Sequence, residues 1–387
     1  MIYLDSAAST PIHEEVLQEM LPYFKEQYGN PSSIHRYGRL AAKAIDIARK
    51  RIAELINAKQ NEILLTSGGT ESNNTALFGI MRQNKARQII TSDIEHDAIL
   101  EPCKRLQREG FDVIYLPVDN YGTVDIEKLK NSITKETALV SIMFANNEVG
   151  TIQPIKEIAQ ICKQHNILFH TDAIQAVGKI PIDVKDIGVD LLSISSHKIN
   201  GPKGIGALYI KNGTKLAPFI LGGGQENGMR SGTENVANIV GFGKACYLAK
   251  ENLDKNVIHM KNLRDHLTSR IINEISHVSI NGSMENKTPN NTHFTFLGVN
   301  GEDLIIKLDE HGVAASTGSA CSVKTQKASH VLMAMGFSHE QITGSLRMTV
   351  GLYNTISEMD QTVDILKKVI QELRSVSPFK TKYDFTS

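Results

Sequence analysis

Residues 193–206 have the sequence SISSHKINGPKGIG, and the rest of the chain is best interpreted outward from this stretch. The apolar run from Leu191 to Ser195 predicts a short buried strand, and residues 200–202, Asn-Gly-Pro, predict a tight turn. Lys198 lies between them, so we expect its amine to face a cleft. Partial desolvation favours a neutral lysine amine, which is the form that attacks an aldehyde. A single lysine in a loop is more often an ordinary surface residue, so this interpretation depends on the other strand ends.

The composition excludes several classes of protein. The 387 residues are enough for one large and one smaller domain. Because 42 basic residues balance 42 acidic ones, we expect no direct nucleic-acid partner and no membrane surface, and no apolar run reaches membrane-spanning length. The four cysteines form no Cys-x-x-Cys pair. We therefore expect a cytoplasmic protein with neither a structural zinc site nor disulfides.

Short apolar runs alternate with segments long enough for helices. They predict seven strands at residues 63–65, 88–91, 113–116, 139–144, 167–170, 191–195 and 207–210. Repeated strand–helix units indicate an α/β fold with a mostly parallel sheet covered on both faces. Ligands of such sheets bind beyond the carboxyl ends of the strands, so the strand ends are where we expect the chemistry.

The first strand end carries glycines before a predicted helix. Gly68 and Gly69 precede Thr70 there, and free N–H groups at a helix start bind anions such as phosphate. Taken alone, this segment is more often an ordinary glycine turn with a threonine cap. It matches neither the P-loop nor the dinucleotide fingerprint.

Later strand ends carry polar residues of other kinds. Glu95 and His96 begin a predicted helix, Asn147 follows the strand at 139–144, and Asp172 follows the strand at 167–170. A carboxylate next to a buried strand is costly unless it faces a positive charge, and a protonated pyridine nitrogen is such a charge. An anion cradle, an acid, amides, an imidazole and an amine together match pyridoxal phosphate, although each alone is a weak signal.

The second half of the chain adds three candidates. Residues 221–235 contain five glycines, after which Thr233 is predicted to begin a helix running to about residue 249 and to offer a second phosphate contact. Cys321 lies among small residues, which favours an exposed, mobile and reactive thiol; the other three cysteines lie in helical patterns and are expected to be buried. Arg347, between apolar neighbours, is expected to meet an anion, and its guanidinium fits a carboxylate.

The chain resembles the cysteine desulfurases of the class V aminotransferase family. The resemblance covers almost the whole chain and rests on the segments Leu4–Pro11, Gly69–Asn73, Glu95–His96, Asn147–Gly150, Ser196–Ile199, Gly222–Glu226, Arg230–Asn235 and Gly318–Cys321. It implies a fold-type I pyridoxal-phosphate transferase. The large domain would span residues 16–255, and residues 1–15 and 256–387 would form a smaller α+β domain carrying the cysteine loop. The run of small residues around Cys321 is similar to that of the long-loop branch.

The resemblance also implies a role for each matching residue. Lys198 would bind the cofactor covalently, His96 would stack on its ring, and Cys321 would take sulfur from L-cysteine as a persulfide, releasing alanine. Arg347 and Asn147 would bind the substrate. The remaining cofactor contacts would come from Gly69, Thr70, Asn147, Asp172, Gln175, Ser195 and His197, with Thr233 supplied by the second subunit of a homodimer.

Several alternatives remain open at the level of sequence. A selenocysteine lyase or another class V lyase, a conventional aminotransferase and a catalytically silent sulfur carrier share parts of the pattern. The sulfur acceptor is also open: an iron–sulfur scaffold protein, a transfer-RNA thiolation enzyme or a cofactor-synthesis protein. No metal ligand is predicted with certainty, because the sequence leaves open whether Cys321 shares a cluster with a partner.

Overall fold

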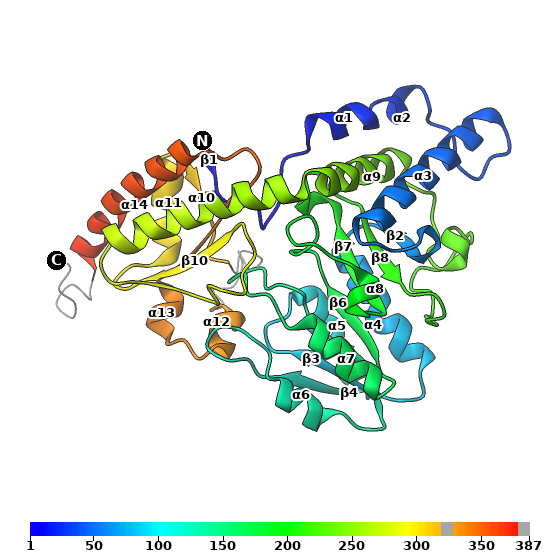
Figure 1. The fold of residues 1–387 in the computed structure, drawn as a ribbon, viewed down its shortest axis with the longest axis horizontal. Coiled ribbons are helices and arrows are strands. Elements are labelled where there is room, and N and C mark those ends of the chain that lie inside the picture. Colours follow the sequence, from blue (N-terminus) through cyan, green and yellow to red (C-terminus); the bar gives the residue numbers. More distant parts are fainter. Residues whose placement is uncertain (319–327, 378–387) are drawn as a thin grey trace.

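A computed structural model describes residues 1–318 and 328–377 of the chain. Its larger part is built on a seven-stranded sheet with the order β2-β8-β7-β6-β5-β3-β4 (Figure 1). The strands are β2 (Ile63–Thr66), β3 (Gln88–Ser92), β4 (Asp112–Leu116), β5 (Thr137–Ser141), β6 (Leu168–Asp172), β7 (Leu191–Ser195) and β8 (Gly206–Ile210). All seven predicted strands are therefore present. The fourth begins and ends earlier than predicted, at residues 137–141 instead of 139–144.

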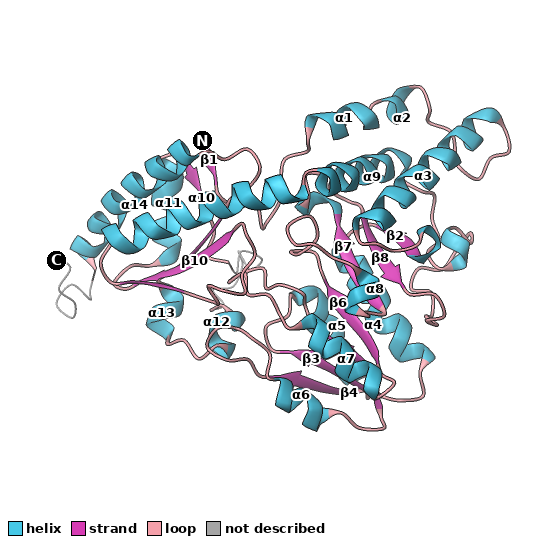
Figure 2. Cartoon of the chain, viewed as in Figure 1, coloured by secondary structure: helices cyan, strands magenta, loops and turns pink. Residues whose placement is uncertain are grey.

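The sheet is parallel except for β8, which pairs antiparallel with both β2 and β7. Every other neighbouring pair is parallel. Helices cover the sheet on both faces, as Figure 2 shows, and this explains why the strands are apolar throughout rather than alternating. The covering helices are α3 (Arg36–Leu55), α4 (Gly69–Gln83), α5 (Asp97–Arg108), α6 (Ile126–Ser132), α7 (Ile155–Gln164), α8 (Val184–Ile187) and α9 (Val236–Glu251).

A second hydrophobic core lies at the other end of the molecule. It surrounds an antiparallel sheet of β9 (Val278–Ile280), β10 (Asn291–Phe296) and β12 (Ser345–Thr349). The N-terminal strand β1 (Ile2–Tyr3) joins this end by pairing with β11 (Val313–Ala314). The helices here are α10 (Leu253–Glu274), α11 (Gly301–Glu310), α12 (His330–Ala334), α13 (His339–Thr343) and α14 (Ile356–Val376). The long α10 runs from the end of α9 into this second part (Figure 1).

The N-terminal helical segment is divided into α1 (Glu14–Met20) and α2 (Pro22–Lys25), because Pro22 has no amide hydrogen to continue the first helix. One predicted helix start is wrong, for a local reason. The helix expected to begin at Thr233 begins at Val236 instead. Its cap is Asn235, whose side chain accepts a hydrogen bond from the Asn238 amide (3.4 Å).

In the part of the chain that the structure describes, no helix is long and apolar enough to cross a membrane.

Candidate active site

Lys198 stands where the sequence places it, directly after a buried strand. It ends a short 3-10 turn, Ser196–Lys198, that follows β7, and its side chain is half-buried. Its Nζ donates hydrogen bonds to the carbonyl oxygens of Ala7 (2.5 Å) and Ala8 (2.7 Å). Gln175 Nε2 donates to the same Ala7 oxygen (2.9 Å). The N-terminal segment therefore lies against the lysine and helps to enclose it.

Asp172 is a buried carboxylate at the carboxyl end of β6, only 6% exposed. Its Oδ2 accepts a hydrogen bond from Asn73 Nδ2 (2.6 Å) and its Oδ1 from the Ile174 amide (3.0 Å). Burial raises its pKa, against the opposing effect of those hydrogen bonds and of the nearby His96 and Lys198. None of the ion pairs within residues 1–318 and 328–377 includes Asp172. A protonated ring nitrogen would supply the missing positive charge, so this acid fits a pyridine cofactor.

The start of α4 has the geometry of an anion cradle. Gly68, at the N-cap, has φ +152°, and a Cβ on Gly69 would lie 2.0 Å from Ile174 Cδ1 and 3.6 Å from Ser195 Cβ. The helix start is thus pressed against the ends of β6 and β7. Thr70 is exposed in the first turn, beside the N–H groups and the positive end of a 15-residue helix. These residues fit a phosphate group.

His96 caps α5 and is held in one orientation. Its Nδ1 accepts a hydrogen bond from the Ala98 amide (3.0 Å), so the neutral ring carries its proton on Nε2. The neighbouring Glu95 is fully buried, and burial raises its pKa to about 8. Its Oε1 accepts from Ser92 Oγ (2.5 Å) and the Met143 amide (3.0 Å). Glu95, next to His96 in the sequence, is therefore neutral at neutral pH.

His197 is held in its neutral form beside Lys198. Burial, together with the charges of Lys198, Lys203 and Lys179, lowers its pKa to about 4. Its Nδ1 lies 3.4 Å from Ser9 Oγ, and its backbone oxygen accepts a hydrogen bond from Thr10 Oγ1 (2.9 Å). The imidazole can therefore act as a hydrogen-bonding group without adding positive charge.

Arg347 reaches the site from β12, on the second core, and is 3% exposed. Its Nη1 donates to the Asn147 carbonyl (2.9 Å) and its Nη2 lies 2.8 Å from Asp5 Oδ1. The sequence predicts an anion next to this arginine, and Asp5 of the N-terminal segment provides one of its negative partners. Arg347 Nε has no hydrogen-bond partner among the described residues although it is buried. An incoming carboxylate would satisfy it.

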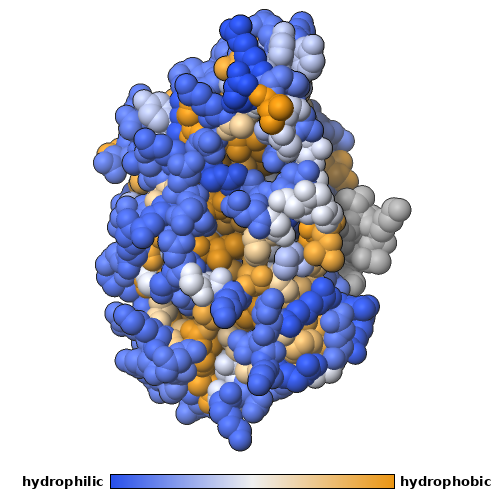
Figure 3. Space-filling model, turned by 90° about the vertical axis from the view of Figure 1, so that its right-hand side faces the viewer, coloured by the Kyte–Doolittle hydropathy of each residue, from blue (hydrophilic) through white to orange (hydrophobic). Residues whose placement is uncertain are grey.

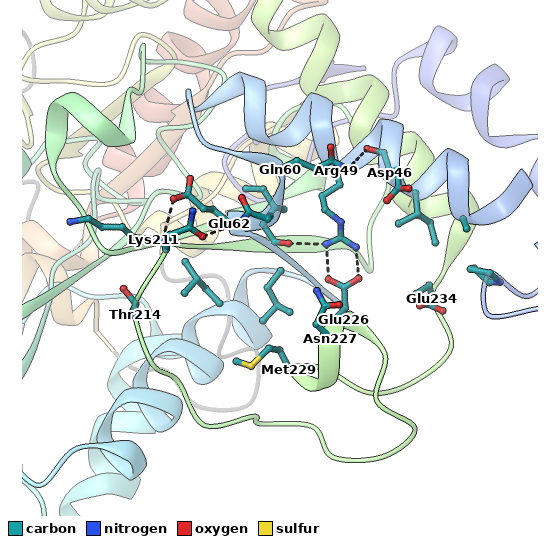
Figure 4. A pocket seen from close by; sticks show the side chains of 18 of the residues that line it. Asp46, Arg49, Gln60, Glu62, Lys211, Thr214, Glu226, Asn227, Met229 and Glu234 are labelled. Carbon is teal, nitrogen blue, oxygen red and sulfur yellow. Dashed lines mark hydrogen bonds and ion pairs between the residues drawn. The ribbon is translucent and has the colours of Figure 1, made fainter. Parts of the chain in front are cut away.

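The glycine-rich loop before α9 is joined to α3 and α4 by two ion pairs. Glu226 accepts hydrogen bonds from Arg49 Nη1 (2.7 Å) and Nη2 (2.5 Å), and Figure 4 shows this pair across a hollow beside α3. Arg230 Nε lies 2.9 Å from Glu71 Oε1, in the first turn of α4. Thr233 is exposed on this loop. The two ion pairs thus hold the middle of the loop in place, while Thr233 remains exposed.

Cys321 lies outside the described residues, but one buried acid, Glu148, lies beside residues on both sides of its segment. Ser329 Oγ donates to Glu148 Oε2 (2.6 Å), and a Cβ on Gly318 would lie 3.2 Å from that same oxygen. Burial raises the pKa of Glu148. The other cysteines are buried as predicted, and burial raises the pKa of Cys103 and of Cys162 to about 12.

The structure thus brings Lys198, Asp172, His96 and Gln175 together, and adds residues to which the sequence assigned no role. Asn73 follows the glycine turn by one helical turn, and that spacing could have been used to find it. Glu95, Asp5, Glu148 and Lys179 become functional candidates only through burial and long-range contacts, which leave no local signal in the sequence.

Comparison with known proteins agrees with this arrangement. Residues 2–362 match the family model described as aminotransferase class-V. Cysteine desulfurase IscS of Dictyoglomus turgidum is 51% identical over 384 residues, which are 99% of this chain and 98% of that protein. A solved structure described as a NifS-like protein superposes with a TM-score of 0.90 at 40% identity, covering 97% of this chain and all of that one. Another, described as SspA in complex with cysteine, has a TM-score of 0.81 at 37% identity, covering 92% of this chain and 100% of that one.

The chain therefore belongs to the class V aminotransferase family, whose fold is that of the fold-type I pyridoxal-phosphate enzymes. Within the family it groups with the cysteine desulfurases, since relatives with that name match it at about half identity from end to end. Its cofactor is accordingly pyridoxal 5'-phosphate.

Proposed function

We propose that the protein is a desulfurase acting on L-cysteine, which it converts to L-alanine while the thiol of Cys321 becomes a persulfide. The equation balances: a cysteine and a thiol give an alanine and a persulfide, and no external oxidant or reductant is needed. The observation that carries the proposal is the convergence of Lys198, Asp172 and His96 at neighbouring strand ends, opposite an arginine whose buried Nε lacks a partner.

We assign the cofactor contacts as follows. Lys198 would hold the aldehyde carbon, and its amine would move protons when it is released. Asp172 would keep the ring nitrogen protonated, and Asn73 would keep Asp172 in place through its 2.6 Å hydrogen bond. His96 would lie on the ring, with Nε2 carrying the proton. When bound, the cofactor supplies an electron sink that makes cleavage of the substrate's carbon–sulfur bond feasible. The phosphate contacts would be Gly69, Thr70, Ser195 and His197, with Asn147 and Gln175 near the ring oxygen.

Arg347 would bind the substrate carboxylate. Its Nη2 already pairs with Asp5. The substrate carboxylate would therefore bind at Nε, on one edge of the guanidinium group, and would not take both Nη donors. Arg347 Nη1 donates a hydrogen bond to the Asn147 carbonyl (2.9 Å). The arginine that binds the substrate would therefore also be linked to the segment that contains Asn147.

Cys321 would be the sulfur acceptor within the enzyme. Glu148 supports this assignment, because its carboxylate accepts a hydrogen bond from Ser329 on one side of the cysteine segment and lies beside Gly318 on the other.

The two hydrophobic cores favour a division into a large domain, residues 16–255, and a small domain, residues 1–15 and 256–387. One core surrounds the seven-stranded sheet, and the other includes Ile2 and Leu4 together with residues from Met260 to Ile370. The proposed boundary falls within α10, so this helix would join the two domains covalently.

A homodimer would complete the cofactor site. Thr233 is exposed on a loop tied to α3 through the Arg49–Glu226 ion pair, and Figure 3 shows hydrophobic residues gathered along the middle of the face at this end of the molecule. Large apolar side chains are exposed in and next to α2, α3 and this loop: Phe24, Tyr28, Ile34, Tyr37, Leu40 and Leu221. An exposed apolar face of this kind favours association, and a second copy would bring its Thr233 to the phosphate.

Sulfur would then pass from Cys321 to an acceptor, either an iron–sulfur scaffold protein or a transfer-RNA thiolation enzyme. We place this reaction in the cytoplasm, where free thiols persist, consistent with the unpaired Cys103, Cys162 and Cys246. Among the residues described, no group of three or more histidine, cysteine or acidic side chains is arranged to hold a metal ion.

The decisive experiment compares Cys321→Ser with Cys103→Ala, which removes a buried thiol instead. We expect Cys321→Ser to retain the visible absorption of the bound cofactor, to bind L-cysteine and to form no persulfide. Cys103→Ala should still form alanine and persulfide. Undiminished sulfur release by Cys321→Ser would refute the proposal, and retained activity on selenocysteine alone would favour a selenocysteine lyase.

A further inference from the structure

A second cavity touches Lys198 without belonging to the site described above. Its volume is about 450 Å3, and it lies between the N-terminal segment, the junction of α9 and α10, and residues 350–353. Lys198 lines it, but His96, Asp172, Ser195 and Arg347 do not. The cavity is therefore distinct from the pocket in which the cofactor ring would sit.

The lining of this cavity is strongly basic. The basic side chains are His13, Lys179, Lys198, Lys255 and His259, and the only acidic one in the lining is Glu15. The Glu15 carboxylate is already engaged, because its Oε2 lies 2.8 Å from Lys244 Nζ. Amide side chains such as Asn256 and Asn290 also line the cavity. Positive charge and amide donors gathered around one space favour a negatively charged occupant.

Lys179 is the residue that needs such an occupant. It is 5% exposed, and its Nζ donates to the Gln175 carbonyl at 3.3 Å. No carboxylate in the described ranges, 1–318 and 328–377, forms an ion pair with it. An ammonium group has three donors, and burying it with one carbonyl partner is costly. Burial lowers its pKa to about 7, with a further contribution from Lys198, and an anion beside it would favour the charged form.

We propose that this cavity binds a small oxyanion, a carboxylate or an inorganic phosphate or sulfate, through Lys179, with Lys255 and Asn256 as further contacts. The anion would lie on the side of Lys198 that faces this cavity. Lys179 is linked to Lys198 through Gln175, whose side chain and Lys198 share the Ala7 carbonyl. An anion bound in this cavity would thus affect, through these hydrogen bonds, the lysine that holds the cofactor.

The test uses the cofactor-loaded enzyme with inorganic phosphate as the probe. Calorimetric titration is run at constant ionic strength against chloride, so that only specific binding produces a saturable signal. Lys179→Met removes a charge-assisted hydrogen bond and should weaken binding at least about tenfold. Lys179→Arg should restore most of it. Lys163→Met, which removes an exposed lysine from α7, is the matched control and should bind as the native enzyme does.

Lys255→Met provides a second variant at an exposed position, where folding is not in question, and should weaken phosphate binding about two- to fivefold. No saturable binding to the native enzyme, or unchanged affinity in Lys179→Met, would overturn the inference. The readout does not require turnover. This separates the site from the proposed function. If the native enzyme showed no cofactor absorption, the assignment of Lys198 would be wrong, but phosphate binding that depends on Lys179 would still support this cavity as an anion site.

Discussion

Glu95 provides a prediction whose size follows directly from its surroundings. Burial raises its pKa from 4.5 to about 8. In the unfolded chain the group ionises at its ordinary pKa, while in the folded protein it stays neutral until about pH 8. The contribution of Glu95 to folding stability should therefore be most favourable below pH 4.5, become less favourable as the pH rises from 4.5 to 8, and then level off. At 1.36 kcal/mol per unit, a shift of about 3.5 units corresponds to about 5 kcal/mol.

Glu95→Gln should remove this dependence. The amide oxygen can keep the hydrogen bonds from Ser92 and Met143, while the NH2 group takes the place of the protonated oxygen. Urea unfolding would be measured at a series of pH values between 5 and 8.5, at fixed protein concentration. The difference between variant and native protein should grow with pH in favour of the variant. Glu136→Gln, at an exposed acid before β5, is the control and should show no such trend. Parallel stability curves for Glu95→Gln and the native enzyme would refute the reasoning.

Three further variants test other parts of the site. Arg347→Gln should raise the KM for L-cysteine about 10- to 150-fold and leave the cofactor absorption unchanged; an unaltered KM would mean that the arginine serves only Asp5. Asp172→Asn should retain the cofactor but lose at least about 100-fold in kcat, because the ring nitrogen is no longer kept protonated; near-native kcat would contradict that role. Ser329→Ala leaves Glu148 without its hydroxyl partner and should cost about 1–3 kcal/mol of stability and slow persulfide formation, measured by mass spectrometry; a normal rate would show that this contact does not position Cys321.

Much of the fold could be predicted because the sheet is buried on both faces. Each strand is then a short apolar run between turns, and the run at residues 191–195 coincides with β7. One error lies at the start of a helix. At α9 the cap is Asn235 rather than Thr233. Several polar residues in succession can cap a helix, so the sequence does not decide which one does.

The candidate site was predictable to the extent that it follows topology. Parallel strands end at one edge of the sheet, so Asp172 and Lys198 had to lie near each other. The contact between Asp5 and Arg347 could not be predicted, because it joins residues 342 positions apart through the pairing of β1 with β11. Lys179 was missed for a related reason: it is buried beside a cavity that residues of α9 and α10, distant in the sequence, also line, and nothing in its own sequence neighbourhood indicates this.

Lys179 lies close enough to Lys198 for their charges to interact, so identifying the lysine that carries the cofactor tests the central claim. Lys179 is the more deeply buried, while Lys198 follows β7 at the carboxyl edge of the sheet, near Asp172. Borohydride reduction of the loaded enzyme, followed by digestion and mass spectrometry, identifies the lysine that carries the cofactor. We predict the pyridoxyl group on the peptide containing Lys198 and none on the peptide containing Lys179. Label on Lys179, or on no lysine at all, would contradict the account.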